Sequence, residues 1–505
     1  MAQAVDRRRK QVVEEPSSTV HVAPGARVLA RQPVISPRYS EIRARDDSAM
    51  GTIAFTPNAV KELVKHYCWM LYRGSPVPSL LLIGPPGVGK STAVKEVAEE
   101  IAMHLGKDFV DITDKTHRDK VYREIMECAK TKDLNTCLSE RNYFLFMDLR
   151  LTEVEPVDLV GYPYREEGRM EYAPPAWALL FSWFPGILFL DELSNVRRED
   201  VMAAAYKLLL DKAAGFTKFH RDVLVVAAGN LPEHAPGIAQ PLPPPVVNRT
   251  SLLFVSAPSV EDWYEWMVSK ISRFSDDLRS ELLETLNFIY LHLLNNRGDF
   301  FNLEEAKSSM KGENFPSPRS WSHLVFSYPM SVLRSLVNQP EALIGALSSF
   351  VGPTVARKLA VAVSRYTVVP YKDILADPDA LDRYLESLGK DASMALIYLV
   401  AGLPMRILEF KPSPDVVRKI AEKVYSNGAK YAGDPGFACT LVEALGVALS
   451  KLPHALKLND SDRAYVTAVA TAVSEVWSSA GCRPDNVLMR IARKRAGALG
   501  SGTRK

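Results

Sequence analysis

An eight-residue segment, GPPGVGKS at positions 84–91, constrains the fold of this 505-residue chain more than any other feature. An apolar run (80–83) precedes it and a stretch with helical composition (92–105) follows, which predicts a strand, a loop and a helix in succession. Glycines at these spacings let backbone N–H groups turn toward phosphate oxygens, and the N-terminus of the next helix adds a favourable dipole. The segment therefore predicts a phosphate-binding loop and the binding of a nucleoside triphosphate.

The predicted nucleotide-binding residues form one continuous set: Gly84, Pro85, Pro86, Gly87, Val88, Gly89, Lys90, Ser91 and Thr92. In this motif the lysine, here Lys90, reaches the β- and γ-phosphates, and the hydroxyl of the next residue, Ser91, ligates Mg²⁺. A chance glycine loop is the alternative, which the flanking strand and helix disfavour. ATP and Mg²⁺ are the expected cofactors, and no residue marks a preference for ATP over GTP.

The composition is that of an ordinary globular protein. The chain has 47% hydrophobic and 24% charged residues, and its length predicts two to four domains. Its 62 Lys and Arg against 59 Asp and Glu give a net charge of +3, which is too balanced to predict nucleic-acid binding from charge alone. No apolar run reaches membrane-spanning length, so we expect no membrane span.

The five cysteines are scattered along the chain: Cys68, Cys128, Cys137, Cys439 and Cys482. They form no C-x-x-C pair, which argues against a zinc site and against a disulfide framework. We therefore expect reduced thiols and a cytoplasmic protein.

Apolar runs and helical patterns divide the chain into four regions. Residues 1–50, rich in Arg, Pro and Ser, are predicted to be a largely disordered basic arm. Residues 51–257 alternate strands with helices, which predicts an α/β domain with a mostly parallel sheet. A helical lid is predicted at 258–366 and a further all-helical domain at 367–505. The strand candidates lie at 80–83, 143–147, 187–190, 223–227 and 252–255.

Two acidic residues, Asp191 and Glu192, end the third strand candidate. Open α/β sheets bind their ligands at the carboxyl ends of the strands. Asp191 is therefore expected to hold Mg²⁺, and Glu192 to orient the attacking water or accept its proton. Such a pair can also cap the following helix, but its place downstream of a phosphate-binding loop favours the catalytic role.

Three further polar residues are candidates for catalysis. Asn230 follows the fourth strand candidate and is predicted to hold the attacking water or the γ-phosphate, although an ordinary turn asparagine would look the same. Arg249 precedes the fifth strand candidate, where an arginine could point into the nucleotide of a neighbouring copy. Arg319 opens a helix of the lid and could reach the γ-phosphate. For both arginines the alternative is an exposed side chain without a role.

Taken together, GPPGVGKS, ILFLDE, AAGN, PPPVVNRT and SPRSW resemble the motifs of an AAA+ ATPase. Within that superfamily the chain most resembles the MoxR-type group, because of DLRL at 148–151, VDLVGYP at 157–163 and PPAWALL at 174–180. The resemblance covers roughly residues 51–366. It implies a five-stranded core, a helical lid, a hexameric ring and chaperone-like remodelling of a protein client, often alongside a von Willebrand A-type partner.

The sequence departs from this pattern in places. Asn248 stands where many relatives have aspartate, so the role of Arg249 depends on the alignment there. A charged helical stretch (113–141) is an addition that can contact a partner or be an embellishment. A predicted hairpin at 164–172 carries aromatic and charged side chains that can face a central pore or only solvent. The metal-binding signature of the A-type partner is absent from the sequence, so such a partner would be a separate chain.

The leading hypothesis is an ATP-hydrolysing hexamer that remodels or activates a protein client. The alternative is a nucleic-acid-associated motor or a restriction or defence component. Only the basic arm and tail support it, and the sequence has no helix-turn-helix or zinc-finger pattern. A third possibility, a nucleotide-gated scaffold with little turnover, is disfavoured by the intact Lys90, Asp191 and Glu192.

Overall fold

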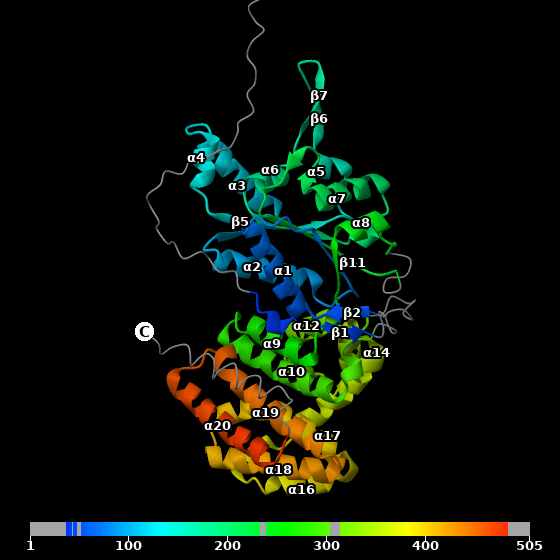
Figure 1. Ribbon diagram of the computed structural model, residues 1–505. Coiled ribbons are helices and arrows are strands. Elements are labelled where there is room, and N and C mark those ends of the chain that lie inside the picture. Colours follow the sequence, from blue (N-terminus) through cyan, green and yellow to red (C-terminus); the bar gives the residue numbers. More distant parts are fainter. Residues whose placement is uncertain (1–36, 43, 48–51, 233–238, 303–313, 483–505) are drawn as a thin grey trace, which may run out of the picture. The chain divides into compact units, whose positions relative to one another are not determined.

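The computed structural model describes residues 37–42, 44–47, 52–232, 239–302 and 314–482, all within the compact unit Ile35–Lys505. Strands are gathered in its first part, and its later part is helical (Figure 1). Most of the predicted basic arm lies outside the described residues. The end of that segment forms the 3-10 helix η1 (Tyr39–Glu41) and strand β1 (Ala44–Asp47), which pairs with β2 (Thr52–Phe55).

The central sheet has six parallel strands in the order β12-β3-β11-β8-β5-β4. They are β3 (Leu80–Ile83), β4 (Asp108–Asp111), β5 (Tyr143–Arg150), β8 (Gly186–Asp191), β11 (Val223–Gly229) and β12 (Ser251–Phe254). The α/β class and the five predicted strands are confirmed. The predicted number of strands is wrong by one, because β4 adds to the edge beside β5. Its sequence, DFVD, has only two apolar residues and gives a weak strand signal.

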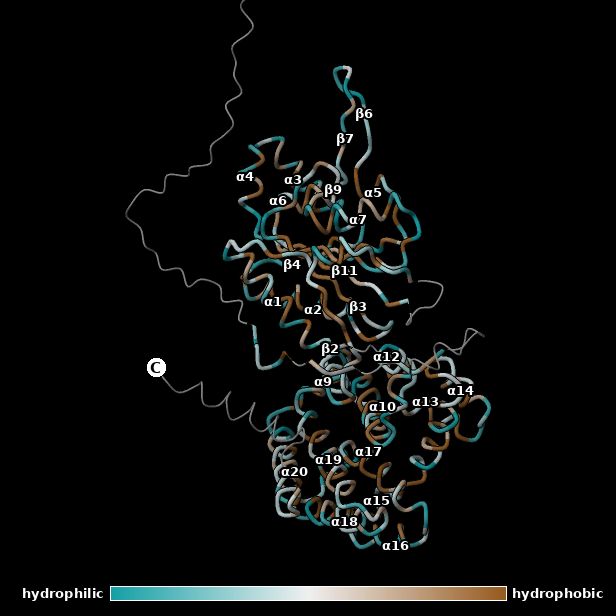
Figure 2. The backbone as a smooth tube through the Cα atoms, turned by 45° about the vertical axis from the view of Figure 1, so that its right-hand side comes forward, coloured by the Kyte–Doolittle hydropathy of each residue, from teal (hydrophilic) through white to brown (hydrophobic). Residues whose placement is uncertain are grey.

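Alternate residues of the strands enter two different cores. Leu80 and Leu82 pack with helices α1 and α2 on one face, and Leu81 and Ile83 pack with α3, α6 and α7 on the other. These helices are α1 (Pro57–Tyr72), α2 (Lys90–His104), α3 (Lys115–Cys128), α6 (Ala176–Trp183) and α7 (Glu199–Asp211). Because both faces are covered, the strands are apolar throughout, as their colours in Figure 2 show.

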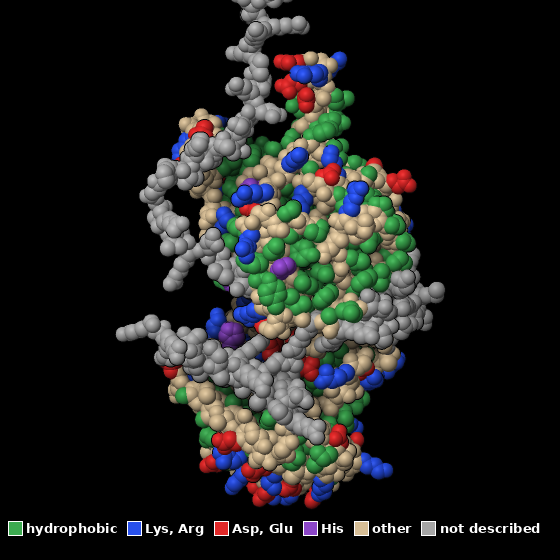
Figure 3. Space-filling view, viewed as in Figure 1, with side chains coloured by type: hydrophobic (Ala, Val, Ile, Leu, Met, Phe, Trp, Pro, Cys, Tyr) green, Lys and Arg blue, Asp and Glu red, His purple; other side chains and the backbone are tan. Residues whose placement is uncertain are grey.

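Smaller elements surround this sheet. The charged stretch 113–141 is helical as predicted and forms α3 and α4 (Leu134–Ser139). The predicted hairpin is confirmed as β6 (Tyr162–Glu166) and β7 (Arg169–Ala173), and charged side chains lie at its tip (Figure 3). The remaining elements are α5 (Pro156–Val160), η2 (Leu193–Asn195), β9 (Ala213–Ala214), β10 (Thr217–Lys218) and α8 (Pro244–Arg249).

After β12 the described chain is helical, as predicted. Buried apolar side chains from Val260 to Trp477 form one continuous cluster, which joins the predicted lid and the C-terminal helices in a common core. The elements are α9 (Val260–Ile271), α10 (Asp276–Asn295), η3 (Arg297–Asp299), α12 (Pro318–Ser327), α13 (Met330–Ser335), α14 (Pro340–Thr367), α15 (Tyr371–Ala376), α16 (Ala380–Leu388), η4 (Gly389–Asp391), α17 (Ala392–Phe410), α18 (Pro414–Ala432), α19 (Pro435–Ala455) and α20 (Asp460–Ser479).

Four of the five cysteines form disulfides, so the expectation of reduced thiols is wrong. Cys128 bonds Cys137, and Cys439 bonds Cys482, whereas Cys68 is free and buried. The partners are 9 and 43 residues apart in sequence. They meet because α3 packs on α4 and α19 packs on α20, an arrangement that cysteine spacing alone does not reveal.

In the described part of the chain, three segments are long and apolar enough to cross a membrane by length and composition: Pro340–Thr367, Ala380–Phe410 and Pro435–Ala455. The sequence expectation considered uninterrupted apolar runs, whereas these helices intersperse polar residues, Gly and Pro. In this structure 50%, 67% and 61% of their most apolar windows is buried. Packing within the helical region thus gives these apolar side chains an environment without a membrane.

Candidate nucleotide site

The predicted site residues meet at the carboxyl end of the sheet. Strand β3, which leads into the glycine loop, pairs with β11, and β11 pairs with β8. The register places Ile83 beside Gly229 and Ala227 beside Leu190. Asn230 and Asp191, which follow β11 and end β8, therefore lie at the same edge as the loop.

The loop backbone has the conformation that a phosphate-binding segment needs. Gly87 and Gly89 have φ angles of 77° and 99°, which favour glycine, and α2 begins directly after them. A Cβ atom at Gly84 would lie 2.2 Å from the carbonyl oxygen of Val255, so any residue larger than glycine would clash there. Pro85, Pro86 and Val88 complete the loop, and Ser91 and Thr92 lie in the first turn of α2.

Lys90 is buried at the centre of the site, with 9% of the residue exposed. Its ammonium donates to the carbonyl oxygens of Gly84 (2.8 Å) and Pro85 (2.9 Å) and to Oδ1 of Asn230 (3.2 Å). Burial lowers the pKa of Lys90 to about 8, although the charge of Asp191 opposes this shift. These contacts hold the ammonium beside the loop that is predicted to bind phosphate.

The hydroxyl of Ser91 donates to Oδ2 of Asp191 over 2.9 Å. A hydroxyl and a carboxylate are hard oxygen donors, which Mg²⁺ prefers, so the two residues fit the metal for which they were predicted. The glycine loop and Lys90 fit the triphosphate, because backbone N–H groups and an ammonium donate hydrogen bonds to phosphate oxygens.

Glu192 lies beside the proposed metal ligand in a rare backbone conformation, with φ 61° and ψ 30°. Its N–H donates to Oδ1 of Asp191 (2.9 Å), and its Oε2 accepts the hydroxyl of Thr152 (2.7 Å). Sequence reasoning missed Thr152, because this contact joins residues 40 positions apart and no local pattern marks it. The Thr152 bond fixes the direction of the Glu192 carboxylate.

Asn230 connects two parts of the site. Its Oδ1 accepts a hydrogen bond from the Lys90 ammonium, and its backbone N–H donates to the hydroxyl of Ser194 (2.8 Å). Ser194 is fully buried just after β8. Ser194 was also missed, since a single serine after Asp-Glu has no distinctive signal. The Ser194 contact holds the backbone of Asn230, and the Lys90 contact holds its side chain beside the loop.

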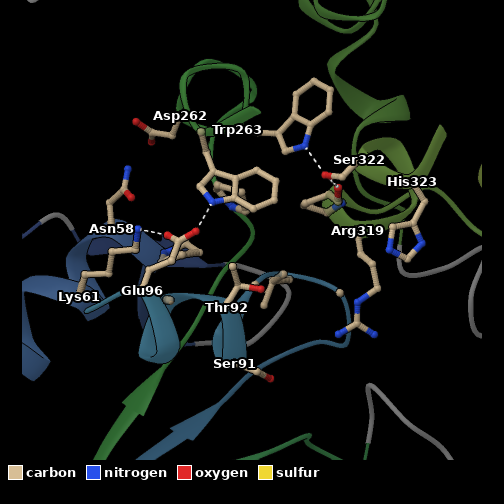
Figure 4. Close-up of a pocket in the computed structure, with 18 of the residues that line it drawn as sticks. Asn58, Lys61, Ser91, Thr92, Glu96, Asp262, Trp263, Arg319, Ser322 and His323 are labelled. Atoms are coloured by element: carbon tan, nitrogen blue, oxygen red, sulfur yellow. Dashed lines mark hydrogen bonds and ion pairs between the residues drawn. The ribbon is translucent and has the colours of Figure 1, made fainter. Parts of the chain in front are cut away.

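The two predicted arginines differ in their position. Arg319 lies in the first turn of α12, its N–H donates to the carbonyl of Gly87 (3.2 Å), and its side chain extends toward the loop (Figure 4). Arg249 ends α8, is exposed, and is not among the described residues that line the pocket. The structure therefore brings Arg319, but not Arg249, to the pocket of its own chain.

The pocket beside the loop has a volume of about 330 Å³, within the usual range for small-molecule sites. It lies between the loop, α1, α9 and α12 (Figure 4). Among its walls are residues that sequence reasoning did not single out: Asn58, Glu96, Asp262, Trp263, Trp266 and His323. They come from distant segments, so only the fold reveals that they surround one cavity.

Asp148 is a further acidic residue that sequence reasoning did not assign to the site. It lies on β5, next to β8, and its Oδ1 atom is buried without a hydrogen-bond partner. Burial, together with the nearby charge of Asp191, raises the pKa of Asp148 to about 6. An ionised Asp148 therefore places a second, unfavourable negative charge near that of Asp191.

We expect Asp148→Asn to stabilise the protein without nucleotide or metal, more at pH 8 than at pH 4.5. The folded carboxyl has a pKa of about 6 against an ordinary 3.8, so the folded state binds more protons in this window. The stability of the parent protein consequently falls as pH rises from about 4 to about 6. At pH 8 the gain should be about 1–2 kcal/mol, allowing for partial exposure.

Urea unfolding in EDTA at both pH values measures this effect. Asp108→Asn, which changes an exposed aspartate of the neighbouring strand β4, is the matched control and should change stability little. An equal gain at both pH values, or no gain for Asp148→Asn, would contradict the account of the site.

The comparison with protein families agrees with this geometry. Residues 80–240 match the family model described as "ATPase family associated with various cellular activities (AAA)". No curated protein matches the chain. A crystal structure of a proposed ATPase from Cytophaga hutchinsonii aligns with 15% identity and a TM-score of 0.26, over 59% of this chain and 79% of that chain, which is too loose to carry an argument. The match of residues 80–240 to this family model, together with the parallel sheet and its glycine loop, shows an α/β P-loop fold of the AAA+ type.

Proposed function

We propose that this protein is an oligomeric, ATP-hydrolysing AAA+ ATPase of the MoxR type that remodels a protein client. The observation that supports it most is the convergence of Lys90, Ser91, Asp191 and Asn230 at one edge of the sheet, held by mutual hydrogen bonds. Among the described residues there is no group of three or more His, Cys, Asp and Glu side chains that could hold a metal ion. The described residues add no specific support for the nucleic-acid-associated alternative, which rests on a basic arm and tail that lie largely outside them.

Each residue has a distinct task in the proposed reaction. The loop backbone and Lys90 bind and orient the triphosphate, and Mg²⁺ held by Ser91 and Asp191 would offset charge on the phosphate oxygens. Glu192, directed by Thr152, orients the attacking water and accepts its proton. Asn230 positions the water or the γ-phosphate, and Arg319 contributes positive charge from the lid. Because these tasks are positioning and charge neutralisation, no covalent intermediate is required.

The pocket of one chain lacks Arg249, and this motivates the proposed oligomer. An exposed arginine at the edge of an AAA+ domain can complete the site of an adjoining copy, where it stabilises the charge that develops during phosphoryl transfer. We propose a ring, with six copies as the expected number, in which ATP at each interface draws Arg249 of the neighbour into place. A von Willebrand A-type protein on a separate chain is a candidate partner.

Calorimetric titration of ATP with Mg²⁺ tests the nucleotide site. The parent protein should bind, and Lys90→Ala should weaken binding about 10- to 100-fold, because charge-assisted hydrogen bonds to phosphate contribute roughly 1.5–3 kcal/mol. Lys115→Ala, an exposed lysine at the start of α3, is the control and should bind like the parent. A parent protein that binds neither ATP nor GTP would rule out the proposed function.

A further inference from the structure

The pocket extends beyond the part that a triphosphate would occupy. Gly87, Gly89 and Ser91 line its phosphate end. Its other end is bounded by Asn58 and Lys61 of α1, Glu96 of α2, and Asp262 and Trp266 of α9. If the proposed function holds, this second end must receive the rest of the nucleotide.

Glu96 is the centre of a partly buried polar cluster at this end. Its Oε1 accepts the indole N–H of Trp266 (2.7 Å) and pairs with the Lys270 ammonium (2.5 Å), and its Oε2 pairs with Lys61. Only 15% of the Glu96 side chain is exposed. Burial works to raise the pKa of Glu96, but the charge of Lys61 and the hydrogen bonds from Lys270, Lys61 and Trp266 outweigh it, and the pKa lies below the usual value.

The indole of Trp266 is therefore fixed from two directions. Its N–H is bound by Glu96, and the ammonium of Lys270 lies 5.4 Å from the ring centroid, a cation–π contact. The ring is partly buried and forms part of the cavity wall. A single carboxylate on the helix that starts at Lys90 thus sets the position of an aromatic ring on α9, 170 residues later in sequence.

We infer that Trp266 is the wall on which the purine ring of the nucleotide packs, and that Glu96 is the positioning residue that holds this wall. Aromatic side chains stack on nucleobases through their flat faces and tolerate either purine. The inference rests on the proposed function and extends it, because it assigns the base end of the site to residues outside every motif of the sequence. It also predicts that phosphate binding at the other end of the pocket does not depend on Glu96 and Trp266.

Binding of two probes distinguishes the base end from the phosphate end. ADP contains the purine, whereas inorganic tripolyphosphate contains only phosphates, and both are titrated in Mg²⁺ buffer by calorimetry. Trp266→Ala should weaken ADP binding about 10-fold or more and leave tripolyphosphate binding within about twofold. Trp266→Phe, which keeps a flat ring but loses the N–H that Glu96 holds, should bind ADP more tightly than Trp266→Ala and more weakly than the parent protein.

Glu96→Gln tests the positioning role. The amide can still accept the indole N–H but loses both ion pairs, so we expect ADP binding to weaken about 3- to 10-fold, again without an effect on tripolyphosphate. Trp69→Ala, a change to a tryptophan of α1 that does not line the pocket, is the control.

Four outcomes are decisive. Equal losses for ADP and tripolyphosphate, or no loss of ADP binding in Trp266→Ala, would overturn the inference. If Trp266→Ala does not fold, Trp266→Phe and Glu96→Gln decide, since unchanged ADP binding in Glu96→Gln would equally overturn it. A parent protein that binds neither probe would instead refute the proposed function, so the two failures are separable.

Discussion

Glu192→Gln should lower ATP turnover by about 10²- to 10⁴-fold while ATP binding persists, the range that general-base catalysis typically contributes. Glutamine has nearly the same size and can still accept the hydroxyl of Thr152, so the geometry around Asp191 should remain. It cannot accept a proton from the attacking water. Phosphate release under saturating ATP measures the loss, and calorimetry measures the retained binding.

The control for Glu192→Gln is Glu199→Gln, an exposed glutamate in the first turn of α7 that should leave turnover unchanged. Phosphate release at the parent rate from the Glu192→Gln protein would show that the assignment of the base is wrong. The same variant, loaded with ATP, should retain a client that the parent protein releases. Recovery of a client with ATP but not with ADP would support the proposed remodelling role.

The strands were predictable because both faces of the sheet are buried. Each central strand has to be apolar at every position, so β3, β8 and β11 appear in the sequence as continuous hydrophobic runs. Strand β4 is at the edge, where fewer side chains are buried, and its short run was overlooked. Burial on two faces is thus the reason why most strands of the sheet could be predicted from the sequence.

The catalytic motifs were predictable for a related reason. Asp191 ends β8, Asn230 follows β11, and Lys90 follows the glycine loop after β3, so all three lie at the one edge where parallel strands end together. By contrast, the contacts of Thr152 and Glu96 join residues that are far apart in sequence. Nothing in their neighbours indicates such a bond, because it depends on how separate helices and loops pack.

The disulfides show the same limit. Cys439 and Cys482 are joined because α19 and α20 lie against each other, and their pairing depends on the fold rather than on a spacing motif. Long-range contacts of this kind, whether covalent or polar, were invisible in the sequence even where the local secondary structure was predicted correctly.

Arg249→Ala should lower turnover about 10³-fold or more, which is the usual contribution of an arginine supplied to a phosphoryl-transfer site by a neighbouring protein. The side chain is exposed at the end of α8 and does not line the pocket of its own chain, so the affinity of an isolated chain for ATP should not change. Phosphate release and ATP titration measure the two effects. Arg123→Ala, an exposed arginine of α3, is the control.

Mixing two inactive variants tests whether Arg249 acts between copies. The Arg249→Ala chain keeps an intact Glu192, and the Glu192→Gln chain keeps an intact Arg249, so a mixed assembly contains interfaces at which both residues are present. Activity should therefore return on mixing, and its dependence on the mixing ratio should follow the number of such interfaces. If the mixture stays inactive although the variants assemble together, Arg249 acts within its own chain or not at all. If a protein that remains monomeric hydrolyses ATP at full rate, the site needs no second copy, and Arg319 of the lid would be the arginine that completes it.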